Sequence, residues 1–475
     1  MIGSIINGQE RTTSENTKAV INPYNNEKVE EIALASRDDL EDAITNSFDT
    51  FHNTMKSLAA HERSDILRKT ADLLEENTEE FAQTIVKEAG KPITFSRSEV
   101  GRAVQVIRFA SEQAKHISGE VVPMDAAIGG EGRLGLVKRI PLGVVGAITP
   151  FNFPLNLSLH KIAPAIAAGN TVIFKPAEKT PISAHMLTKL FTEAGLPDGV
   201  LNLVLGTGKD VGEPLVQHDK VHKISFTGSL PVGRSIRKTA GLKKVTLELG
   251  SNSPNILFDD TDVEQAVKLL VKGAFAFSGQ VCISAQRVYV QKNIYDQFLE
   301  QYVKQTNDLK IGNPKDEDTD IGPMISEEEA ERAKQWIDDA VENGATIAAG
   351  GEQNGTILTP TIMTDVDKNM KIIAEEVFAP IVSVIPFDTE DQVVGFSNDS
   401  IYGLQAGVFT KDLDRALRVA DSLEMGGVWI NEISTYRQDN HPYGGVKQSG
   451  IGKEGVKYAV EDMTELKFIG MKLKQ

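Results

Sequence analysis

The strongest constraint on the fold is a series of short apolar segments between residues 143 and 250, each followed by a stretch with helical spacing. Five such segments occur in order: GVVGAITP, NTVIFKPAE, GVLNLVLG, KISFTGS and KKVTLELG. Apolar strands that alternate with amphipathic helices form parallel sheets with helices on both faces. The sequence therefore predicts an α/β fold, with a doubly wound sheet in this part of the chain.

Polar residues stand where four of these predicted strands end. They are Asn152, Lys175 with Glu178, Gly228 with Ser229, and Glu248. In open parallel sheets, ligands bind in a crevice beyond the carboxyl ends of the strands. We therefore expect these side chains to face one ligand-binding crevice.

The turn FTGS, which ends a strand and opens a helix, is a candidate phosphate site. Backbone N–H groups and the dipole at a helix N-terminus attract anions. The segment GTGKDVG is weaker evidence, because it has one residue too many for the G-x-G-x-x-G fingerprint. Lys175 and Glu178 can bond ribose hydroxyls, and a carboxylate there repels a 2′-phosphate, which favours NAD over NADP. In isolation, this pair is equally well explained as an ordinary surface ion pair.

The chain contains a single cysteine, Cys282, in the segment FSGQVCISAQR. One thiol can neither close an intrachain disulfide nor supply a thiolate metal cluster, and we expect no metal site. Taken alone, a free cysteine is more often a small buried hydrophobe than a nucleophile. Cys282 lies in a second α/β region that begins near residue 251, so we expect an active site between two domains.

Charge and hydropathy exclude several partners. The chain has 67 acidic and 50 basic residues, a formal net charge of −17, which opposes binding to nucleic acid and to anionic membranes. The N-terminal segment lacks the basic start and apolar core of a signal peptide, and no apolar run approaches the roughly 18 residues of a membrane helix. We therefore expect a cytoplasmic protein that binds neither nucleic acid nor membranes.

Seven segments resemble, in order and spacing, the signatures of the NAD(P)-dependent aldehyde dehydrogenase superfamily: TPFNFP, FKPAEKTP, FTGS, LELGSNSP, GQVC, EEVFAP and PYGGVKQSG. The resemblance covers nearly the whole chain and is closest in pattern to lactaldehyde and semialdehyde dehydrogenases. It implies a homodimer or homotetramer. It also implies a Rossmann-type NAD-binding domain (1–118 and 142–250), an α/β catalytic domain (251–447) and a small β oligomerisation element (119–141 and 462–475).

The resemblance also assigns roles within the site. Cys282 is expected to attack the aldehyde as a thiolate, and Asn152 to stabilise the resulting oxyanion together with the Cys282 backbone N–H. Glu248 is expected to activate the water that hydrolyses the thioester. The implied cofactor contacts are Thr149, Phe151, Lys175, Glu178, Gly228, Ser229, Glu376 and Phe378.

Three residues are candidate substrate contacts: His160 in the helix after the Asn-Phe-Pro turn, Arg437 in the loop STYRQDNHPYGG, and Arg108 in VIRFASEQ. A guanidinium binds a carboxylate, phosphate or sulfonate through two parallel hydrogen bonds. These residues predict a small hydroxy- or acid-tailed aldehyde of the lactaldehyde, semialdehyde, phosphoaldehyde or sulfoaldehyde type. Each also has a structural interpretation, as a buried core histidine or a helix-surface arginine.

Two other functions are possible for such a chain. A CoA-acylating aldehyde dehydrogenase passes the thioester to a thiol instead of water and generally lacks the base, so Glu248 argues against it. A catalytically silent NAD-binding structural protein is expected to lack Cys282, Asn152 or Glu248, and all three are present.

Overall fold

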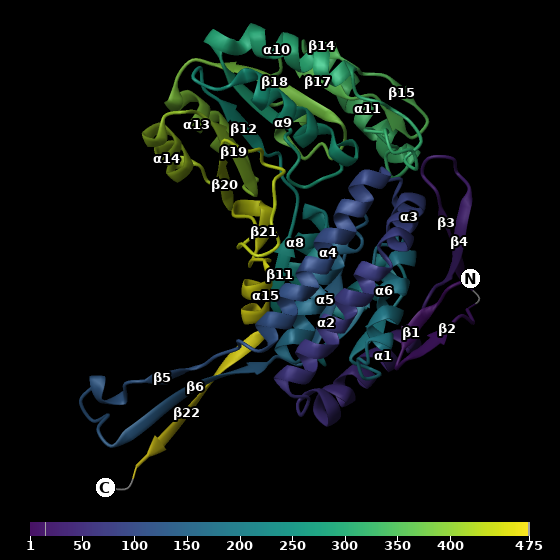
Figure 1. The fold of residues 1–475 in the computed structure, drawn as a ribbon, viewed down its shortest axis with the longest axis vertical. Helices are drawn as coiled ribbons and strands as arrows, with labels where there is room; N and C mark the ends of the chain where they lie inside the picture. Colours follow the sequence, from purple (N-terminus) through teal and green to yellow (C-terminus); the bar gives the residue numbers. More distant parts are fainter. Residues whose placement is uncertain (15, 474–475) are drawn as a thin grey trace.

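The computed structural model describes residues 1–14 and 16–473 and consists of two layered α/β units with an arm that projects from one of them (Figure 1). The first unit lies lower in Figure 1 and contains the N-terminal part of the chain, whereas the second unit contains the strands between residues 254 and 430. This architecture confirms the predicted α/β fold class.

The sheet of the first unit has eight strands in the order β2-β1-β9-β8-β7-β10-β11-β21. Its strands β9, β8, β7, β10 and β11 are parallel, whereas β2 and β21 add antiparallel edges. All five apolar segments predicted as strands therefore belong to one sheet. The strands are β1 Ser4–Ile6, β2 Gln9–Arg11, β7 Val144–Ile148, β8 Thr171–Lys175, β9 Leu201–Leu203, β10 Val221–Thr227, β11 Lys244–Glu248 and β21 Gly450–Ile451.

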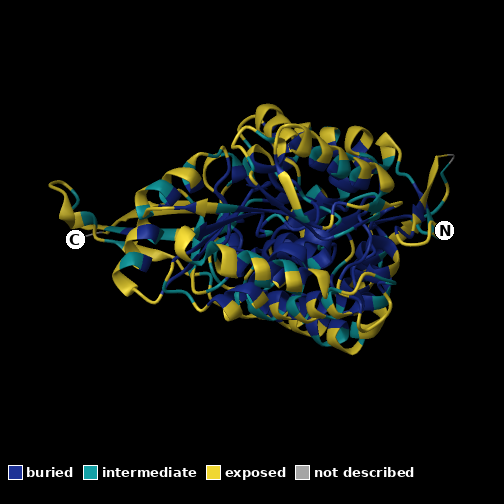
Figure 2. Cartoon of the chain, turned by 90° about the horizontal axis from the view of Figure 1, so that it is seen from above, coloured by how far each residue is buried: buried dark blue, intermediate teal, exposed yellow. Residues whose placement is uncertain are grey.

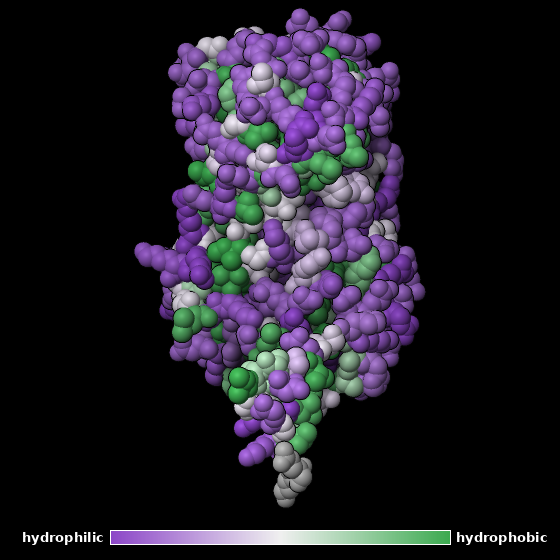
Figure 3. All heavy atoms as spheres, turned by 90° about the vertical axis from the view of Figure 1, so that its left-hand side faces the viewer, coloured by the Kyte–Doolittle hydropathy of each residue, from purple (hydrophilic) through white to green (hydrophobic). Residues whose placement is uncertain are grey.

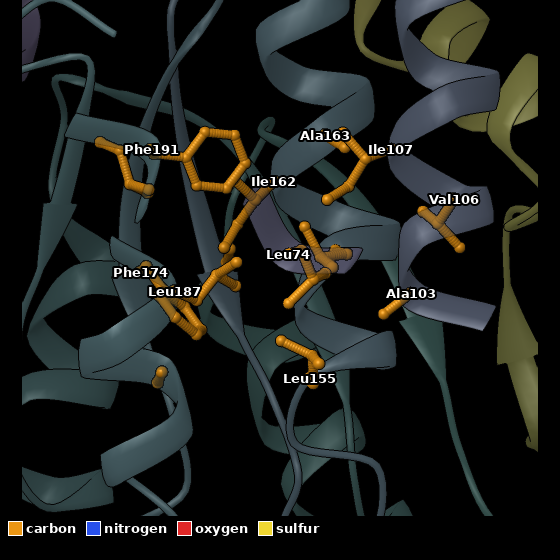
Figure 4. Packing of buried hydrophobic residues seen from close by; sticks show 14 of the residues in the cluster. Leu74, Ala103, Val106, Ile107, Leu155, Ile162, Ala163, Phe174, Leu187 and Phe191 are labelled. Carbon is orange, nitrogen blue, oxygen red and sulfur yellow. The ribbon is translucent and has the colours of Figure 1, made fainter. Parts of the chain in front are cut away.

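Helices cover both faces of this sheet. Neighbouring residues of a strand point to opposite sides, so an apolar strand has side chains to bury on each face. Val145 and Phe174 pack in one cluster with helices α2 to α6 (Figure 4), whereas Val144 and Ile173 pack on the other face with α1, α7 and α8. The helices are α1 Arg37–Thr50, α2 Ala60–Glu76, α3 Thr78–Ala89, α4 Ile93–Ala114, α5 Asn156–Ala168, α6 Ile182–Glu193, α7 Glu213–Gln217 and α8 Leu230–Thr239.

The sheet of the second unit has seven strands in the order β14-β17-β18-β13-β12-β19-β20, and all its pairs except β14 with β17 are parallel. The strands are β12 Pro254–Leu257, β13 Arg287–Gln291, β14 Thr346–Ala349, β17 Thr361–Thr364, β18 Ile381–Phe387, β19 Gln405–Phe409 and β20 Gly427–Ile430. The helices are α9 Val263–Phe275, α10 Lys292–Asn307, α11 Glu327–Glu342, α12 Lys371–Ala374, α13 Glu390–Asn398 and α14 Leu413–Ser422.

The chain crosses between the two units twice. It leaves the first unit after β11 and returns after β20, so that β21 pairs with β11 and helix α15 (Val456–Asp462) packs on α4 and α5. The loop that follows β20 therefore lies against the first unit although it continues from the second. Both crossings bring loops to the boundary between the units.

The projecting arm is an antiparallel sheet in the order β22-β6-β5, formed by β5 Glu120–Val122, β6 Arg133–Pro141 and β22 Thr464–Lys472 (Figure 1). It occupies the segments that were predicted as an oligomerisation element. Hydrophobic side chains gather on it (Figure 3) and include the exposed residues Val121, Leu466, Phe468, Ile469, Met471 and Leu473. Such an exposed apolar surface is typical of a protein interface.

Two short antiparallel hairpins complete the fold: β3 Thr17–Ile21 with β4 Lys28–Ala33, and β15 Gln353–Asn354 with β16 Ile357–Leu358. Burial is concentrated in the strands, while the outer helix faces are exposed (Figure 2). Among the described residues, no helix combines the length and apolar character required to cross a membrane. Within the same residues, no group of three or more His, Cys, Asp or Glu side chains is arranged to hold a metal ion.

Candidate active site

A cleft of about 920 Å³ opens at the carboxyl ends of β7, β8, β10 and β11. Loops of the second unit close its opposite wall. All the residues predicted for catalysis or cofactor binding line this one cavity: Thr149, Phe151, Asn152, Lys175, Glu178, Gly228, Ser229, Glu248, Cys282, Glu376 and Phe378.

Cys282 follows a segment with left-handed backbone geometry. Phe277, Ser278 and Gly279 have φ angles of 48°, 53° and 67°, a conformation that non-glycine residues rarely adopt and that is often found near functional sites. The Cys282 Sγ lies 3.1 Å from the Tyr443 hydroxyl. Burial raises the pKa of the thiol to about 12, so the thiol is protonated at neutral pH in this state.

Asn152 lies against the loop that carries Cys282. Its side-chain Nδ2 donates a hydrogen bond of 2.9 Å to the backbone oxygen of Gln280, and its Oδ1 accepts one of 3.1 Å from the Phe153 N–H. The side chain is therefore fixed from both ends in a buried position. A held amide N–H beside a nucleophile is the type of donor that stabilises an oxyanion.

Glu248 ends β11 with a buried carboxyl group. Neither of its oxygens has a hydrogen-bond partner among the described residues, which is rare for a buried carboxyl group. Burial raises its pKa well above the ordinary value, and the neighbouring charge of Glu454 adds to the effect. An unpartnered carboxyl with a raised pKa is suited to exchange protons near neutral pH.

The turn that was predicted to bind phosphate lies at the N-terminus of α8. Ser229 is the N-cap residue of α8 in an extended conformation, and its side chain makes no capping hydrogen bond. Pro231 has no N–H, so the backbone N–H groups of Leu230 and Val232 are the donors in the first turn that face an anion in the cleft. A Cβ atom at Gly228 would lie 2.5 Å from the Phe226 ring, so a larger residue at this position would clash with that ring.

Lys175 and Glu178 lie at the far end of the cleft, and a third residue joins them. The Lys18 ammonium lies 2.5 Å from the Glu178 carboxylate, whereas burial lowers the pKa of Lys175. Lys18 is not among the predicted residues, because it belongs to the hairpin strand β3, far away in the sequence. The carboxylate that was predicted to exclude a 2′-phosphate therefore has a neutralising partner.

Glu376 and Phe378 face the first unit across the cleft. The Glu376 carboxylate accepts a hydrogen bond of 3.1 Å from the Ser251 N–H, and burial raises its pKa to about 7. The ring of Phe378 meets the ring of Phe151 edge to face, with centroids 6.0 Å apart. These two rings form an aromatic pair where the two units meet.

The structure does not bring Arg108 to the cleft. Its guanidinium lies on the surface of α4, 2.6 Å from Glu75 and 3.8 Å from Asp72, both on α2. Positions on a helix that are not separated by three or four residues point in different directions, and Arg108 faces α2. Arg108 therefore forms a surface ion pair, and this finding corrects the prediction that it contacts the substrate. Arg102, on the same helix, bonds to Asp439 instead.

His160 and Arg102 share one buried carboxylate. The His160 Nε2 lies 2.8 Å from Asp439 Oδ1, and Arg102 donates two hydrogen bonds to the same carboxylate, of 2.6 and 3.1 Å. Burial lowers the pKa of His160, so the imidazole is neutral at pH 7. The pKa of Asp439 is lowered by its bonds to these two side chains.

Arg437 is held by a second buried carboxylate. Its Nη2 donates a 2.9 Å hydrogen bond to Glu454 Oε2, and its guanidinium carbon lies 3.6 Å from the centroid of the Tyr443 ring. Lys161 donates to the other oxygen of Glu454 at 2.7 Å. These two cations lower the pKa of Glu454. Arg437 thus stacks on Tyr443, whose hydroxyl contacts Cys282, and it does not line the cleft.

The charges on this side of Cys282 leave an excess of cations. The fixed charges are Lys161, Arg102 and Arg437 against Asp439 and Glu454, which gives one net positive charge. The His160 imidazole is neutral at pH 7 because burial lowers its pKa, and burial also raises the pKa of Glu248, which disfavours the ionised form of that carboxyl. The region can therefore accept an anion despite the negative charge of the whole protein.

Comparison with known proteins decides the family. The sequence matches the model of the aldehyde dehydrogenase family over residues 10–469. The chain belongs to the aldehyde dehydrogenase family. It is 48% identical over 471 residues to a 3-sulfolactaldehyde dehydrogenase of Priestia aryabhattai, covering 99% of this chain and 98% of the relative. It is 43% identical over 454 residues to a lactaldehyde dehydrogenase of Methanocaldococcus jannaschii, covering 95% and 96% of the two chains.

Solved structures of this family agree. A glyceraldehyde-3-phosphate dehydrogenase from Methanocaldococcus jannaschii complexed with NADP has a TM-score of 0.93 and 42% identity, over 97% of this chain and 99% of that one. Aldehyde dehydrogenase 21 from Physcomitrella patens, in complex with its product succinate, has a TM-score of 0.96 and 37% identity, over 99% and 98%. A betaine aldehyde dehydrogenase from Staphylococcus aureus in complex with NAD+ has a TM-score of 0.96 and 36% identity, over 99% and 95%.

The protein is accordingly an aldehyde dehydrogenase, an oxidoreductase that oxidises aldehydes with a nicotinamide dinucleotide. Members of the family bind NAD or NADP, as the two complexes show. The curated relatives are named as oxidising dehydrogenases. This favours neither the CoA-acylating alternative nor the catalytically silent one.

Proposed function

We propose that Cys282, Asn152 and Glu248 carry out the oxidation, with Cys282 as the nucleophile. The observation that supports this most directly is their convergence. The single thiol of the chain, a fixed amide and a buried carboxyl without a partner line one cleft, although they come from three separate segments. A nucleophile, an oxyanion donor and a base are the three groups that acyl transfer from an aldehyde requires.

In the first half of the reaction, the Cys282 thiol loses its proton to solvent in the cleft, the resulting thiolate adds to the aldehyde carbon, and the carbonyl electron pair moves onto the oxygen. The Asn152 side-chain amide and the Cys282 backbone N–H donate to this oxyanion. The chemistry that a bound nicotinamide dinucleotide supplies is acceptance of the hydride from this carbon. Loss of the hydride leaves a thioester on Cys282.

In the second half, Glu248 removes a proton from water while the water oxygen attacks the thioester carbon. The same two N–H groups stabilise the tetrahedral oxyanion. The C–S bond then breaks, the carboxylic acid leaves, and the Cys282 sulfur takes up the proton that Glu248 removed from water, which restores the thiol and the ionised base. Glu248 must be ionised to act, so its raised pKa places this step under pH control.

The cleft residues fit a dinucleotide. The open N-terminus of α8 at Ser229 suits the pyrophosphate, Glu376 suits the hydroxyls of the nicotinamide ribose, and Phe151 with Phe378 suits the nicotinamide ring. Glu178 lines the far end of the cleft, where its carboxylate accepts from a ribose 2′-hydroxyl and repels a 2′-phosphate. We propose that NAD is preferred and that Lys18, by neutralising Glu178, keeps this preference moderate.

The substrate we propose is a small aldehyde with a hydroxyl or an acidic group near the carbonyl. Relatives at 48% and 43% identity are named for 3-sulfolactaldehyde and lactaldehyde, and a solved relative was crystallised with succinate. The net positive charge around Asp439 and Glu454 favours an anionic tail. Arg102, whose side chain is 31% exposed, is the cation we place at the entrance.

We further propose a homodimer or homotetramer that associates through the arm. Support comes from the exposed apolar side chains of β22, which a monomer would leave in water. A cytoplasmic location stays a prediction from the sequence, whose single cysteine cannot form an intrachain disulfide.

A panel of aldehydes tests the proposed function. Lactaldehyde, succinic semialdehyde, sulfolactaldehyde and the neutral aldehyde propanal are each supplied with NAD or NADP, and reduced nicotinamide is followed by absorbance. We expect a hydroxy- or acid-tailed aldehyde to exceed propanal by at least about tenfold in kcat/KM, without added CoA. Equal use of propanal would contradict the substrate class, and a requirement for CoA would contradict hydrolysis by Glu248.

A further inference from the structure

Two buried charges outside the cleft contact both loops that carry the proposed catalytic groups. Lys91, between α3 and α4, and Glu99, within α4, form an ion pair with both side chains fully buried. Neither residue lines the cleft. Burying two charges costs desolvation energy that their attraction alone often fails to offset. The other contacts of Lys91 and Glu99 therefore indicate what the buried pair does.

Glu99 holds the turn that contains Asn152. Its Oε1 accepts hydrogen bonds from the backbone N–H groups of Leu155, at 3.0 Å, and Asn156, at 3.1 Å. These groups begin α5, whose N-cap residue provides no side-chain cap. A carboxylate at this place satisfies free donors and complements the helix dipole. The Asn-Phe-Pro turn is therefore anchored from α4.

Lys91 joins this turn to the cysteine loop. Its ammonium lies 3.8 Å from the ring centroid of Phe153, the neighbour of Asn152. It also lies 4.7 Å from the ring centroid of Phe277, where the left-handed segment before Cys282 begins. A desolvated ammonium over an aromatic ring is attracted to it. One cation thus binds a ring from each loop.

We propose that Lys91 and Glu99 are a pair of positioning residues that keep the Asn152 amide aligned with the Cys282 loop for oxyanion stabilisation. The 2.9 Å hydrogen bond from Asn152 to Gln280 is the contact that this alignment produces. The inference rests on the proposed roles of Asn152 and Cys282. It requires that loss of the pair slow both aldehyde addition and thioester hydrolysis, because each step develops an oxyanion.

The test uses the full-length variants Lys91→Met and Glu99→Gln. The burst rate measures aldehyde addition, and the steady-state rate measures thioester hydrolysis. The rate of alkylation by iodoacetamide measures the reactivity of the Cys282 thiol, and the cofactor Kd shows whether the first unit still binds the dinucleotide. We expect addition and hydrolysis each to slow by about 10- to 100-fold. The alkylation rate and the cofactor Kd should change by less than about threefold, because neither alkylation nor cofactor binding needs an oxyanion donor.

Lys223→Met is the matched control. Lys223 is also fully buried and ion-paired, at 2.5 Å from Asp462, and it contacts neither Phe153 nor Phe277. The control therefore loses a buried ammonium without touching the two loops. We expect its melting temperature to fall, while its addition and hydrolysis rates per folded enzyme stay within about threefold of wild type.

Asn152→Ala separates this inference from the proposed function. If Asn152→Ala leaves addition unchanged, the proposed function is wrong. If Asn152→Ala slows addition while Lys91→Met and Glu99→Gln do not, or if alkylation slows as much as addition, the positioning role alone is wrong. If neither variant gives protein that melts cooperatively and binds cofactor, the pair acts in folding, and the inference is overturned as well.

Discussion

The two sides of Cys282 are built on different principles. On the cofactor side, polar groups face an open cleft, and the Glu248 carboxyl has no hydrogen-bond partner among the described residues. On the proposed substrate side, His160 is bonded to Asp439 and Arg437 to Glu454, and all four side chains are buried. The first side is ready to accept a ligand, whereas the second is a fixed charge network with a small positive excess.

Glu248 and Glu454 make this difference concrete, because they are two buried glutamates close enough to influence each other. Lys161 and Arg437 bond the Glu454 oxygens and lower its pKa, whereas Glu248 has neither bond and its pKa is raised. The residue type alone therefore does not determine the pKa of a buried glutamate here. The partners supplied by the fold make one glutamate a fixed charge and leave the other free to act as a base.

The largest effect is expected on the open side, from Cys282→Ala. Without the thiol no thioester forms, so turnover should fall by more than about 10⁴-fold. Cofactor binding should persist, because its contacts lie mostly on the first unit. Turnover measured by nicotinamide absorbance and cofactor Kd measured by fluorescence check the two parts. Substantial residual turnover would contradict a covalent mechanism.

Arg102→Leu tests whether the network side selects the substrate. Loss of a charge-assisted hydrogen bond to an anionic tail should lower kcat/KM for an acid-tailed aldehyde by about 10- to 100-fold and spare a neutral aldehyde of equal length. Arg108→Leu, on the same helix but paired with Glu75 on the surface, is the matched control and should change neither. Equal loss for both aldehydes would make Arg102 structural.

The contrast between the two glutamates predicts a pH dependence. Burial and the Glu454 charge raise the pKa of Glu248, and only its ionised form is a base. Hydrolysis should therefore rise with pH up to that raised pKa, by about tenfold per unit. Glu454→Gln removes a repelling charge and frees two cations, so the rising limb should move to lower pH. Single-turnover hydrolysis rates measured across pH test this shift. A rising limb at an unchanged pH would contradict the coupling between the two glutamates.

The smallest effect is expected at the far end of the cleft, from Lys18→Met. Without Lys18, the Glu178 carboxylate is no longer neutralised and should repel a 2′-phosphate more strongly. The ratio of kcat/KM for NADP to that for NAD should fall by roughly threefold to tenfold. Lys28→Met, which removes an exposed lysine from the same hairpin, should leave the ratio unchanged. A higher ratio in Lys18→Met would show that Lys18 does not act through Glu178.

The open side could be predicted from the sequence because it is built from strand ends. Each strand is a short apolar segment, so the polar residue that follows it, such as Asn152 or Glu248, must lie at one edge of the sheet. The turn at Ser229, which we propose binds the pyrophosphate, follows from the same local pattern. Local periodicity and chain order predict these strand-end positions, whereas Glu376 and Phe378, in the same cleft, were predicted only from the family resemblance.

The network side could not be predicted in the same way, because its partners are distant in the sequence. His160 and Asp439 are separated by 279 positions, and Lys18 and Glu178 by 160, so no local pattern joins them. The sequence showed the cations but not the carboxylates that neutralise them. Arg108 differs from Arg102 only in which side of α4 it faces, which depends on packing against α2.

The central claim, that Cys282 carries a thioester which Glu248 helps to hydrolyse, is tested most directly with Glu248→Gln. The variant is mixed with NAD and aldehyde, quenched in acid within the burst, digested, and analysed by peptide mass. We expect about one reduced nicotinamide per site and an acyl group on the peptide that contains Cys282. Reduced nicotinamide together with an unmodified Cys282 peptide, or an acyl group on another residue, would contradict it.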